Sequence, residues 1–213
     1  IDILNNFDIK YERYNAIDGI NNKNIRQNYF ENKNIESYNT NEEYAVLASH
    51  LSLINKLRYE KGDYYLICED DLSLDFIEYW NDDLEKIINN APKDAEIIML
   101  AYFTLNHKFE KDSNYRKWNN DWSALSYIIK KSCINKLDDY IINNKFKLFD
   151  DINVADNYIF RLFNTYLYKY PLFTFTNNNT STFHKDHDLY QKIYKNLNLI
   201  ILNDIINKYF NIP

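Results

Sequence analysis

The stretch Tyr64-Tyr65-Leu66-Ile67-Cys68-Glu69-Asp70-Asp71 decides the fold that we expect for this chain. Its first five residues are apolar and rich in β-formers, and a turn at Lys61-Gly62-Asp63 precedes them. These features together predict a buried strand. Three carboxylates follow the strand at once, and like charges so close together raise the pKa of at least one acid unless a cation lies among them.

The three acids predict a metal site. Ligands of an open α/β sheet bind at the edge where its strands end. Hard oxygen ligands favour Mg²⁺ or Mn²⁺, and such ions usually share their coordination with substrate phosphates. Residues 69–71 therefore indicate a divalent ion that holds a phosphorylated substrate. The alternative is structural: an acidic turn that caps a helix beginning near Phe76.

The composition bounds the class of protein. Hydrophobic residues make up 46% of the 213 residues, which is enough for one domain with a sizeable core. The net charge is −6 and no long basic run occurs, so we expect no nucleic-acid partner. There is no apolar stretch of about 18 residues and no signal-peptide pattern, so we expect no membrane span. Cys68 and Cys133 lie in apolar segments, which favours free buried thiols and a reducing, cytoplasmic compartment.

Glycine is rare, and its rarity excludes several nucleotide-binding motifs. The two glycines are Gly19 and Gly62, so the chain has no GxGxxG motif, no Walker A loop and no kinase glycine loop. A bound nucleotide would need a metal ion to offset its phosphate charge, which agrees with the acids at 69–71. We expect Gly19 to supply a positive φ to the turn at Asp18-Gly19.

Strands and helices alternate along the chain, which predicts an α/β domain with a mostly parallel central sheet flanked by helices. Thr40 followed by Glu43 predicts a capped helix over residues 40–60. The other expected elements are strands at 10–16, 96–101, 123–129 and 165–175, and helices at 75–90, 131–143, 154–163 and 188–209. The domain would span residues 1–185, and the helix within 186–213 would pack on it or on a second copy of the chain.

Several segments resemble glycosyltransferase family 25, which includes lipooligosaccharide and collagen hydroxylysine galactosyltransferases. Ala16-Ile17-Asp18-Gly19 resembles the A-V-D-G turn of the family, and Ser49-His50 resembles its helical S-H pair. Residues 66–71 resemble its I-L-E-D-D strand end, and residues 126–132 resemble its G-Y-x-I-S segment. The resemblance covers about residues 10–175, and Ser49-His50 with residues 69–71 is its most specific part.

The resemblance implies a GT-A-like fold that binds a UDP-sugar through Mn²⁺ or Mg²⁺. It implies transfer of galactose or glucose, with inversion, to a hydroxyl of a glycan or of hydroxylysine in a collagen-like protein. Asp71 would be the first metal ligand, with Glu69 beside it. The donor site that the resemblance implies contains Ala16, Asp18, Gly19, His50, Glu69 and Asp70.

Inversion by one displacement needs a carboxylate that takes the proton of the acceptor hydroxyl. Asp156, near the start of a predicted helix, is the first candidate and Asp151 is the second. His184 and His187 are candidate metal ligands, because a late histidine joins the acidic motif in several GT-A enzymes. Alternatively, these two histidines belong to a surface linker in which Asp186 caps the final helix.

Three further side chains have two interpretations each. Trp118 and Trp122 flank a polar loop, where they would form a stacking platform for an acceptor sugar or pack in a core or interface. His50 would contact the donor, or it would be a packed histidine bonded to backbone.

The chain also departs from the family. The usual N-terminal strand with an N-L-D-R donor segment has no counterpart in the sequence, Val46 or Leu47 replaces a Cys, and Ser126 replaces a Gly. These departures favour a second hypothesis, a catalytically inactive GT-A-like domain that binds glycans or supports assembly. A third hypothesis, a metal-dependent phosphohydrolase, needs more acids converging on the site.

Overall fold

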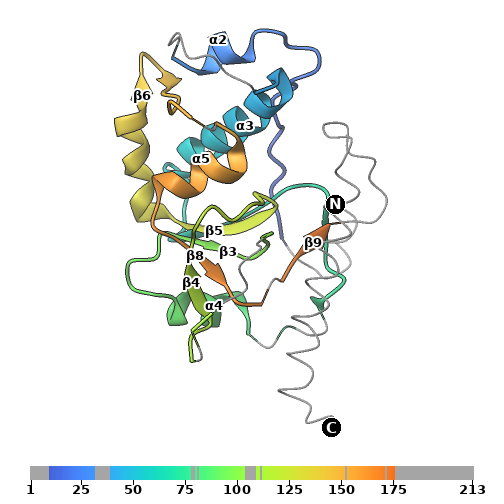
Figure 1. The fold of residues 1–213 in the computed structure, drawn as a ribbon, viewed down its shortest axis with the longest axis vertical. Helices are drawn as coiled ribbons and strands as arrows, with labels where there is room; N and C mark the ends of the chain where they lie inside the picture. The colour runs from blue at the N-terminus through green and yellow to red at the C-terminus, as the bar shows by residue number, and fades with distance from the viewer. Residues whose placement is uncertain are drawn as a thin grey trace.

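A five-stranded sheet forms the centre of the computed structural model, which describes residues 10–31, 39–77, 80, 82–103, 109–110, 112–151, 153–170 and 172–175. The strand order is β1-β5-β3-β8-β4, and Figure 1 shows β5, β3, β8 and β4 in this order. In that order the strands are β1 (Tyr64–Cys68), β5 (Ser126–Lys130), β3 (Ile97–Met99), β8 (Thr165–Tyr168) and β4 (Tyr115–Lys117). The predicted strand over residues 64–68 is confirmed, whereas residues 10–16 form no strand.

The sheet is mostly antiparallel, so the prediction of a mostly parallel sheet is wrong. β5 runs antiparallel to both of its neighbours, β1 and β3, and β4 runs antiparallel to β8; β3 and β8 pair in parallel. A parallel neighbour needs a crossover that carries the chain back along the sheet. The described residues between β3 and β5 form no helix, and the chain enters β5 at the end of the sheet where β3 stops. The result is a mixed α/β single domain.

The reversal of β5 brings several chain segments to one end of the sheet. β1, β3 and β8 point the same way and end there at Cys68, Met99 and Tyr168, while β5 begins there at Ser126, the register partner of Cys68. Residues 69–71 follow Cys68 directly, and we call this end of the sheet the acidic edge. The acids therefore lie beside the segment that leads into β5.

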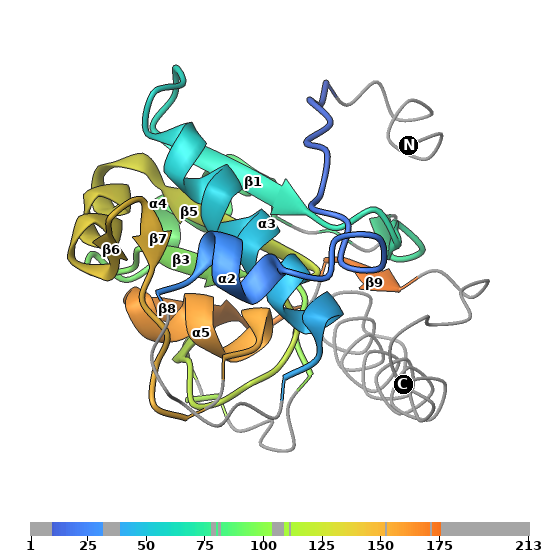
Figure 2. The ribbon, with the colours of Figure 1, turned by 90° about the horizontal axis from the view of Figure 1, so that it is seen from above.

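Helices cover both faces of the sheet. One face carries α2 (Ile25–Tyr29), α3 (Asn41–Leu57), α5 (Ala155–Leu162) and the 3₁₀-helix η2 (Lys131–Tyr140). The other face carries α4 (Leu84–Asn90). Figures 1 and 2 show α3 and α5 side by side over the first face, with α4 on the opposite side.

Each face of the sheet has its own hydrophobic core. The strands contribute side chains to both cores, because successive side chains point to opposite faces. Ile97 and Met99 pack under α3 and α5, whereas Ile98 between them packs under α4. Tyr127 and Ile129 likewise share a core on the first face. This double-sided burial explains why β3 is wholly apolar and why β5 has Tyr127, Ile128 and Ile129 in succession.

Helix α3 begins with the predicted capping box. The hydroxyl oxygen of Thr40 accepts the N–H of Glu43 at 3.2 Å, and the Glu43 carboxylate accepts the N–H of Thr40 at 2.7 Å. The helix ends at Leu57, close to the expected position, so the prediction is confirmed. Its buried face includes Ala45, Leu47, Ala48, Leu51 and Ile54.

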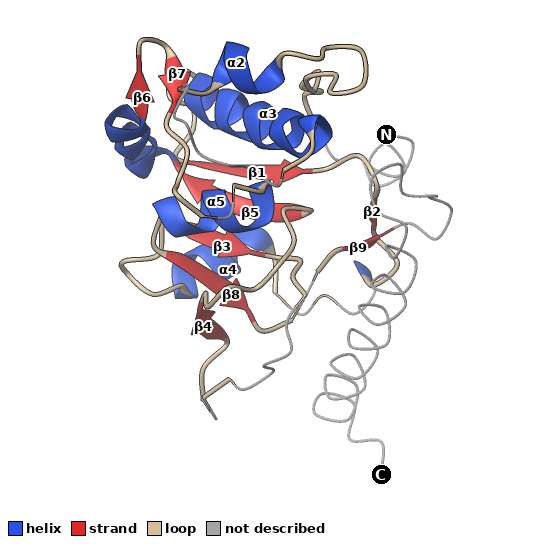
Figure 3. Ribbon diagram, turned by 45° about the horizontal axis from the view of Figure 1, so that its top comes forward, coloured by secondary structure: helices blue, strands red, loops and turns tan. Residues whose placement is uncertain are grey.

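Two other predicted helices differ from the structure, and a third is not tested. Of residues 75–90, those from Leu84 to Asn90 are helical, and β2 (Leu72–Ser73) pairs with β9 (Thr174–Phe175) beside the acidic edge (Figure 3). The helix predicted over 131–143 is η2 followed by the hairpin of β6 (Ile141–Ile142) and β7 (Lys145–Phe146). Its turn residues Asn143 and Asn144 have positive φ, as a two-residue hairpin turn requires. The helix expected at 188–209, like all of 186–213, lies outside the described residues.

The structure also bears on the two cysteines and on the expected absence of a membrane span. Cys68 and Cys133 are free thiols, and burial raises their pKa to about 11 and about 12. Among the described residues, no helix combines the length and apolarity that crossing a membrane would require.

A turn over residues 18–22 packs on the start of α3. The Asn41 side-chain amide donates to the carbonyls of Gly19 and Asn22. A Cβ on Gly19 would lie 2.8 Å from both the Cβ of Ala45 and the Cα of Glu42. Gly19 does not have a positive φ, so the expected reason for this glycine is wrong: the close approach of α3 requires it.

We expect Gly19→Ala to destabilise the fold by about 1–3 kcal/mol, because the added methyl group must push the turn away from the backbone of α3. Urea unfolding measures the loss. Ile20→Ala is the matched control, since the neighbouring side chain of Ile20 is 63% exposed. Equal stability of the two variants would contradict the close packing of the turn.

Candidate active site

The three acids after β1 have different surroundings. The backbone N–H of Glu69 donates to the carbonyl of Leu125 at 2.9 Å, which attaches the acidic turn to the segment before β5. The side chains of Glu69 and Asp71 are partly buried, whereas that of Asp70 is exposed. Glu69 and Asp71 are therefore held by the fold, and Asp70 faces solvent.

Asp71 has the features of a cation ligand. Its Oδ1 atom is buried and has no hydrogen-bond partner in the described part of the chain. Burial, followed by the charges of Glu69 and Asp70, raises the pKa of Asp71 to about 7. A hard divalent cation would give this oxygen a partner and offset the repulsion among the acids. The residues present therefore fit Mn²⁺ or Mg²⁺.

The protein would supply few of the ligands of such an ion. Within the described ranges, no group of three or more His, Cys, Asp or Glu side chains is arranged to hold a metal. Mg²⁺-like ions are commonly bound through one or two carboxylates plus substrate phosphates and water. The other two predicted ligands, His184 and His187, lie outside the described residues.

His50 links the core to the acids. Its Nδ1 atom lies 2.9 Å from the hydroxyl oxygen of Tyr127, and its Nε2 atom lies 3.1 Å from Oε1 of Glu69. Because an ionised carboxylate can only accept, Nε2 donates to Glu69 and Nδ1 accepts from Tyr127. Both ring nitrogens of His50 are hydrogen-bonded to side chains, so the interpretation of His50 as bonded to backbone is wrong. Its contact with a donor substrate stays a prediction. His50 acts as a positioning residue for Glu69.

Tyr127 anchors this chain of hydrogen bonds in the core. Burial raises its pKa well above 10, so its hydroxyl keeps its proton and remains a donor. Its ring packs edge-on against Phe160 of α5 with centroids 5.5 Å apart. The position of His50 is therefore set by a fully buried aromatic ring.

Asp156 lies in the first turn of α5, and its Oδ1 accepts the N–H of Ala124 at 3.1 Å. Burial, followed by the nearby charge of Glu69, raises the pKa of Asp156 to about 6, against the lowering effect of its backbone hydrogen bonds. Asp156 and Glu69 therefore share one electrostatic environment, although they come from different parts of the chain.

Asp151 belongs to a separate cluster. It is exposed and forms an ion pair with Arg161 at 2.7 Å. The guanidinium of Arg161 in turn lies over the ring of Phe149, 4.5 Å from its centroid. This geometry favours Asp156 over Asp151 as the carboxylate of the site.

The turn that contains Ala16, Asp18 and Gly19 is attached to α3 through Ser49. The Ser49 hydroxyl accepts the N–H of Ile17 at 2.8 Å and donates to the carbonyl of Ala45 at 2.7 Å. Ser49 and His50 are adjacent on α3, so one helix turn holds both this turn and Glu69.

The side chains of the turn itself face solvent or one another. Ala16 and Asp18 are exposed. Asp18 accepts the N–H groups of Ile20 and Asn21, at 2.9 and 3.0 Å, and its hydrogen bond with the side chain of Asn21 is the main cause of its lowered pKa. Asp18 therefore stabilises its own turn.

The loop that precedes β5 is part of the site, and sequence analysis did not predict its contacts. The side-chain amide of Asn157 donates to Oδ1 of Asn120 at 3.5 Å, next to Asp156. Asn120 and Ser123 both have positive φ, 56° and 110°, and for Ser123 this conformation is strained. A strained backbone beside a buried carboxyl is typical of functional sites. In the sequence, the polar run between Trp118 and Trp122 is the feature that could have indicated that this loop belongs to the site.

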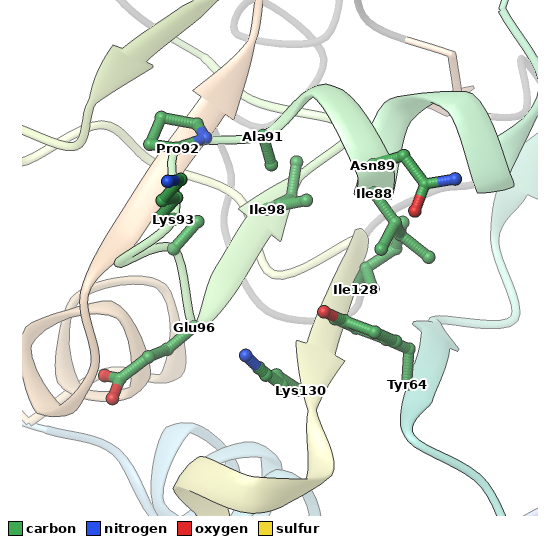
Figure 4. A pocket seen from close by; sticks show the side chains of 11 residues that line it. Tyr64, Ile88, Asn89, Ala91, Pro92, Lys93, Glu96, Ile98, Ile128 and Lys130 are labelled. Carbon is green, nitrogen blue, oxygen red and sulfur yellow. The ribbon is translucent and has the colours of Figure 1, made fainter.

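A pocket with a volume of about 260 Å³ lies at the other end of the sheet. Figure 4 shows it between α4 and the strands, with Tyr64 and Lys130 among its lining residues. Tyr64 begins β1 and Lys130 ends β5, so the pocket is remote from the acids. It is not part of the candidate active site.

Neither a scan of protein-family models nor a search of curated proteins gives a match to this chain. The function must therefore be argued from the residues that the fold brings together. These are Glu69 and Asp71 after β1, His50 on α3, Asp156 on α5 and the loop over residues 118–125.

We expect Asp156→Asn to stabilise the metal-free protein at pH 7.5 by at most about 3 kcal/mol. The folded-state pKa of about 6 lies above the ordinary 3.8, so the folded protein binds this proton more tightly than the unfolded chain. The contribution of Asp156 to stability therefore falls as pH rises from about 4 to about 6 and is then constant. Asparagine lacks this penalty and still accepts the N–H of Ala124.

Urea unfolding in EDTA at a series of pH values measures this difference. The gap between Asp156→Asn and the parent protein should close as the pH approaches about 4. Asp151→Asn is the control, because that carboxylate is exposed. A gap that does not depend on pH would contradict the assigned environment of Asp156.

Proposed function

We propose that this chain is a metal-dependent glycosyltransferase of GT-A-like fold that moves galactose or glucose from a UDP-sugar to a hydroxyl acceptor, with inversion. One observation carries the proposal. At one edge of the sheet, Asp71 with its buried, unpartnered oxygen shares an electrostatic environment with a second carboxyl group, Asp156, from another element. The charge of Glu69, which His50 holds by a hydrogen bond, acts on both. The choice of a UDP-sugar as donor, and of galactose or glucose as the sugar, comes from the resemblance to family 25.

The proposed chemistry uses two carboxylates in different roles. Asp71, with Glu69 beside it, would hold Mn²⁺ or Mg²⁺ against the diphosphate of the donor. When bound, the cation supplies Lewis-acid stabilisation of the negative charge on the leaving group. His50 keeps Glu69 in place through the hydrogen bond at 3.1 Å.

Asp156 would act as the general base. The acceptor oxygen forms a bond to the anomeric carbon while the bond from that carbon to UDP breaks, and its electron pair leaves with UDP. The hydroxyl proton passes to the Asp156 carboxylate. The N–H of Ala124, 3.1 Å from Oδ1, fixes the carboxylate in one orientation before and after the transfer.

The phosphohydrolase and the inactive glycan-binding domain make different demands on the ligands of this site. A phosphohydrolase with two metals needs a larger group of ligands, and within the described residues no group of three or more His, Cys, Asp or Glu is arranged for this. An inactive glycan-binding domain would not need metal-dependent UDP binding. The two experiments below therefore test donor binding and transfer separately.

We expect Asp71→Asn to weaken Mn²⁺-dependent binding of UDP at least about tenfold, since a coordinating carboxylate is lost. Calorimetric titration of UDP with Mn²⁺ and with EDTA measures this. Asp151→Asn removes one carboxylate of the same size at a surface ion pair, so it controls for net charge. UDP affinity that is equal in both variants would contradict the assignment of Asp71.

We expect Asp156→Asn to lower the transfer rate about 10²–10⁴-fold, because an amide cannot take the acceptor proton. UDP affinity should stay within a factor of two of the parent value. The assay is release of UDP from UDP-galactose and UDP-glucose in the presence of saccharide and hydroxylysine-peptide acceptors. A variant that keeps the parent rate would exclude Asp156 as the base.

A further inference from the structure

Trp122 is exposed beside the candidate site, whereas Trp118 in the same loop is not. The indole N–H of Trp118 donates to the carbonyl of Asp121 at 2.8 Å, and its ring packs near Phe160. Trp122 is 45% exposed, between two buried neighbours, Asp121 and Ser123. The loop thus buries Asp121 and Ser123 and exposes the indole between them. Packing in the interior occupies Trp118, whereas Trp122 presents an apolar face to solvent.

The loop around Trp122 is fixed in place. Asp121 is 4% exposed and forms a buried ion pair with Arg116 at 2.7 Å, while its other oxygen accepts the N–H of Asn119. The backbone of Trp122 pairs with that of Phe103 in both directions, at 2.7 and 3.0 Å. The indole is therefore presented by a rigid support, which lowers the entropy cost of binding a ligand.

Contacts on both sides of Trp122 place it next to the proposed base. Two residues before it, Asn120 is bonded to Asn157, and two residues after it, Ala124 donates to Asp156. Asp156 and Asn157 are consecutive residues of α5. A ligand that rests on the indole would therefore lie beside the Asp156 carboxylate.

The surroundings also contain an unsatisfied hydrogen-bond acceptor. Asn157 is 7% exposed, and its Oδ1 atom has no hydrogen-bond partner among the described residues. A buried amide oxygen without a partner is costly unless a ligand or water supplies a donor. A rigid, exposed aromatic face matches a sugar ring, which has an apolar C–H face.

We propose that Trp122 is the platform on which the sugar ring of a saccharide acceptor stacks, so that the acceptor is a glycan and not a hydroxylysine side chain. The stacking holds one ring hydroxyl beside Asp156, and this part of the inference rests on the proposed function. Binding of the sugar itself depends on Trp122 and not on the metal.

Binding of methyl β-galactoside and methyl β-glucoside tests the inference, followed through the indole N–H signals in ¹H–¹⁵N spectra with Mg²⁺ and UDP present. We expect the Trp122 signal to shift in the parent protein. Trp122→Ala should weaken saccharide binding at least tenfold, and Trp122→Phe should keep most of it. Tyr59→Ala is the matched control for loss of a surface aromatic, since Tyr59 is 81% exposed. UDP affinity should not change in any of the three variants.

The outcomes separate this inference from the proposed function. Saccharide binding that needs Trp122 without metal-dependent UDP binding would support the platform and overturn the transferase. UDP binding and transfer to a hydroxylysine peptide, with no saccharide shift, would overturn the platform and leave the transferase intact. Saccharide affinity that is equal in Trp122→Ala and Tyr59→Ala would also overturn the platform.

Discussion

The hydrogen-bonded chain from Tyr127 through His50 to Glu69 is the interaction on which the site depends. It joins three elements: Tyr127 lies in β5, His50 in α3, and Glu69 follows β1. A buried imidazole with both nitrogens bonded has one satisfactory orientation, and in a low-dielectric surrounding each of these bonds is strengthened. Glu69, held in place by this chain, raises the pKa of both Asp71 and Asp156. A contact anchored in the core thus sets the position of the group that acts on both acids.

The direction of β5 determines which segments meet there. Because β5 starts where β1 ends, the loop before Ser126 lies beside residues 69–71, and the carbonyl of Leu125 accepts the N–H of Glu69. The same loop supplies the N–H of Ala124 to Asp156. In a wholly parallel sheet β5 would begin at the opposite end, and this loop would be remote from the acids. One antiparallel strand therefore assembles the site.

The sequence predicted the parts of the structure that have local causes. β1 has a run of β-formers between a turn and charges, and α3 has Thr40 and Glu43 in capping positions. The direction of β5 depends on strand pairing between distant residues, which no local pattern encodes. The close approach of α3 to Gly19 is likewise a tertiary fact. At the site, the resemblance indicated Glu69, Asp71 and His50 as residue types, but the bridging role of His50 required coordinates.

The loop over residues 118–124 has buried residues that stabilise the fold and an exposed aromatic residue that is open to other molecules. Its inward residues carry the fold: Asp121 is paired with Arg116, and Ser123 adopts its strained backbone beside Asp156. The side chain of Trp122 is exposed and contributes little to the packing of the core. Substitutions at exposed positions usually change stability by less than about 0.5 kcal/mol. Position 122 is thus a place where the chemistry of the surface can change by one replacement at a time, without disturbing the buried contacts of Asp121 and Ser123 on either side.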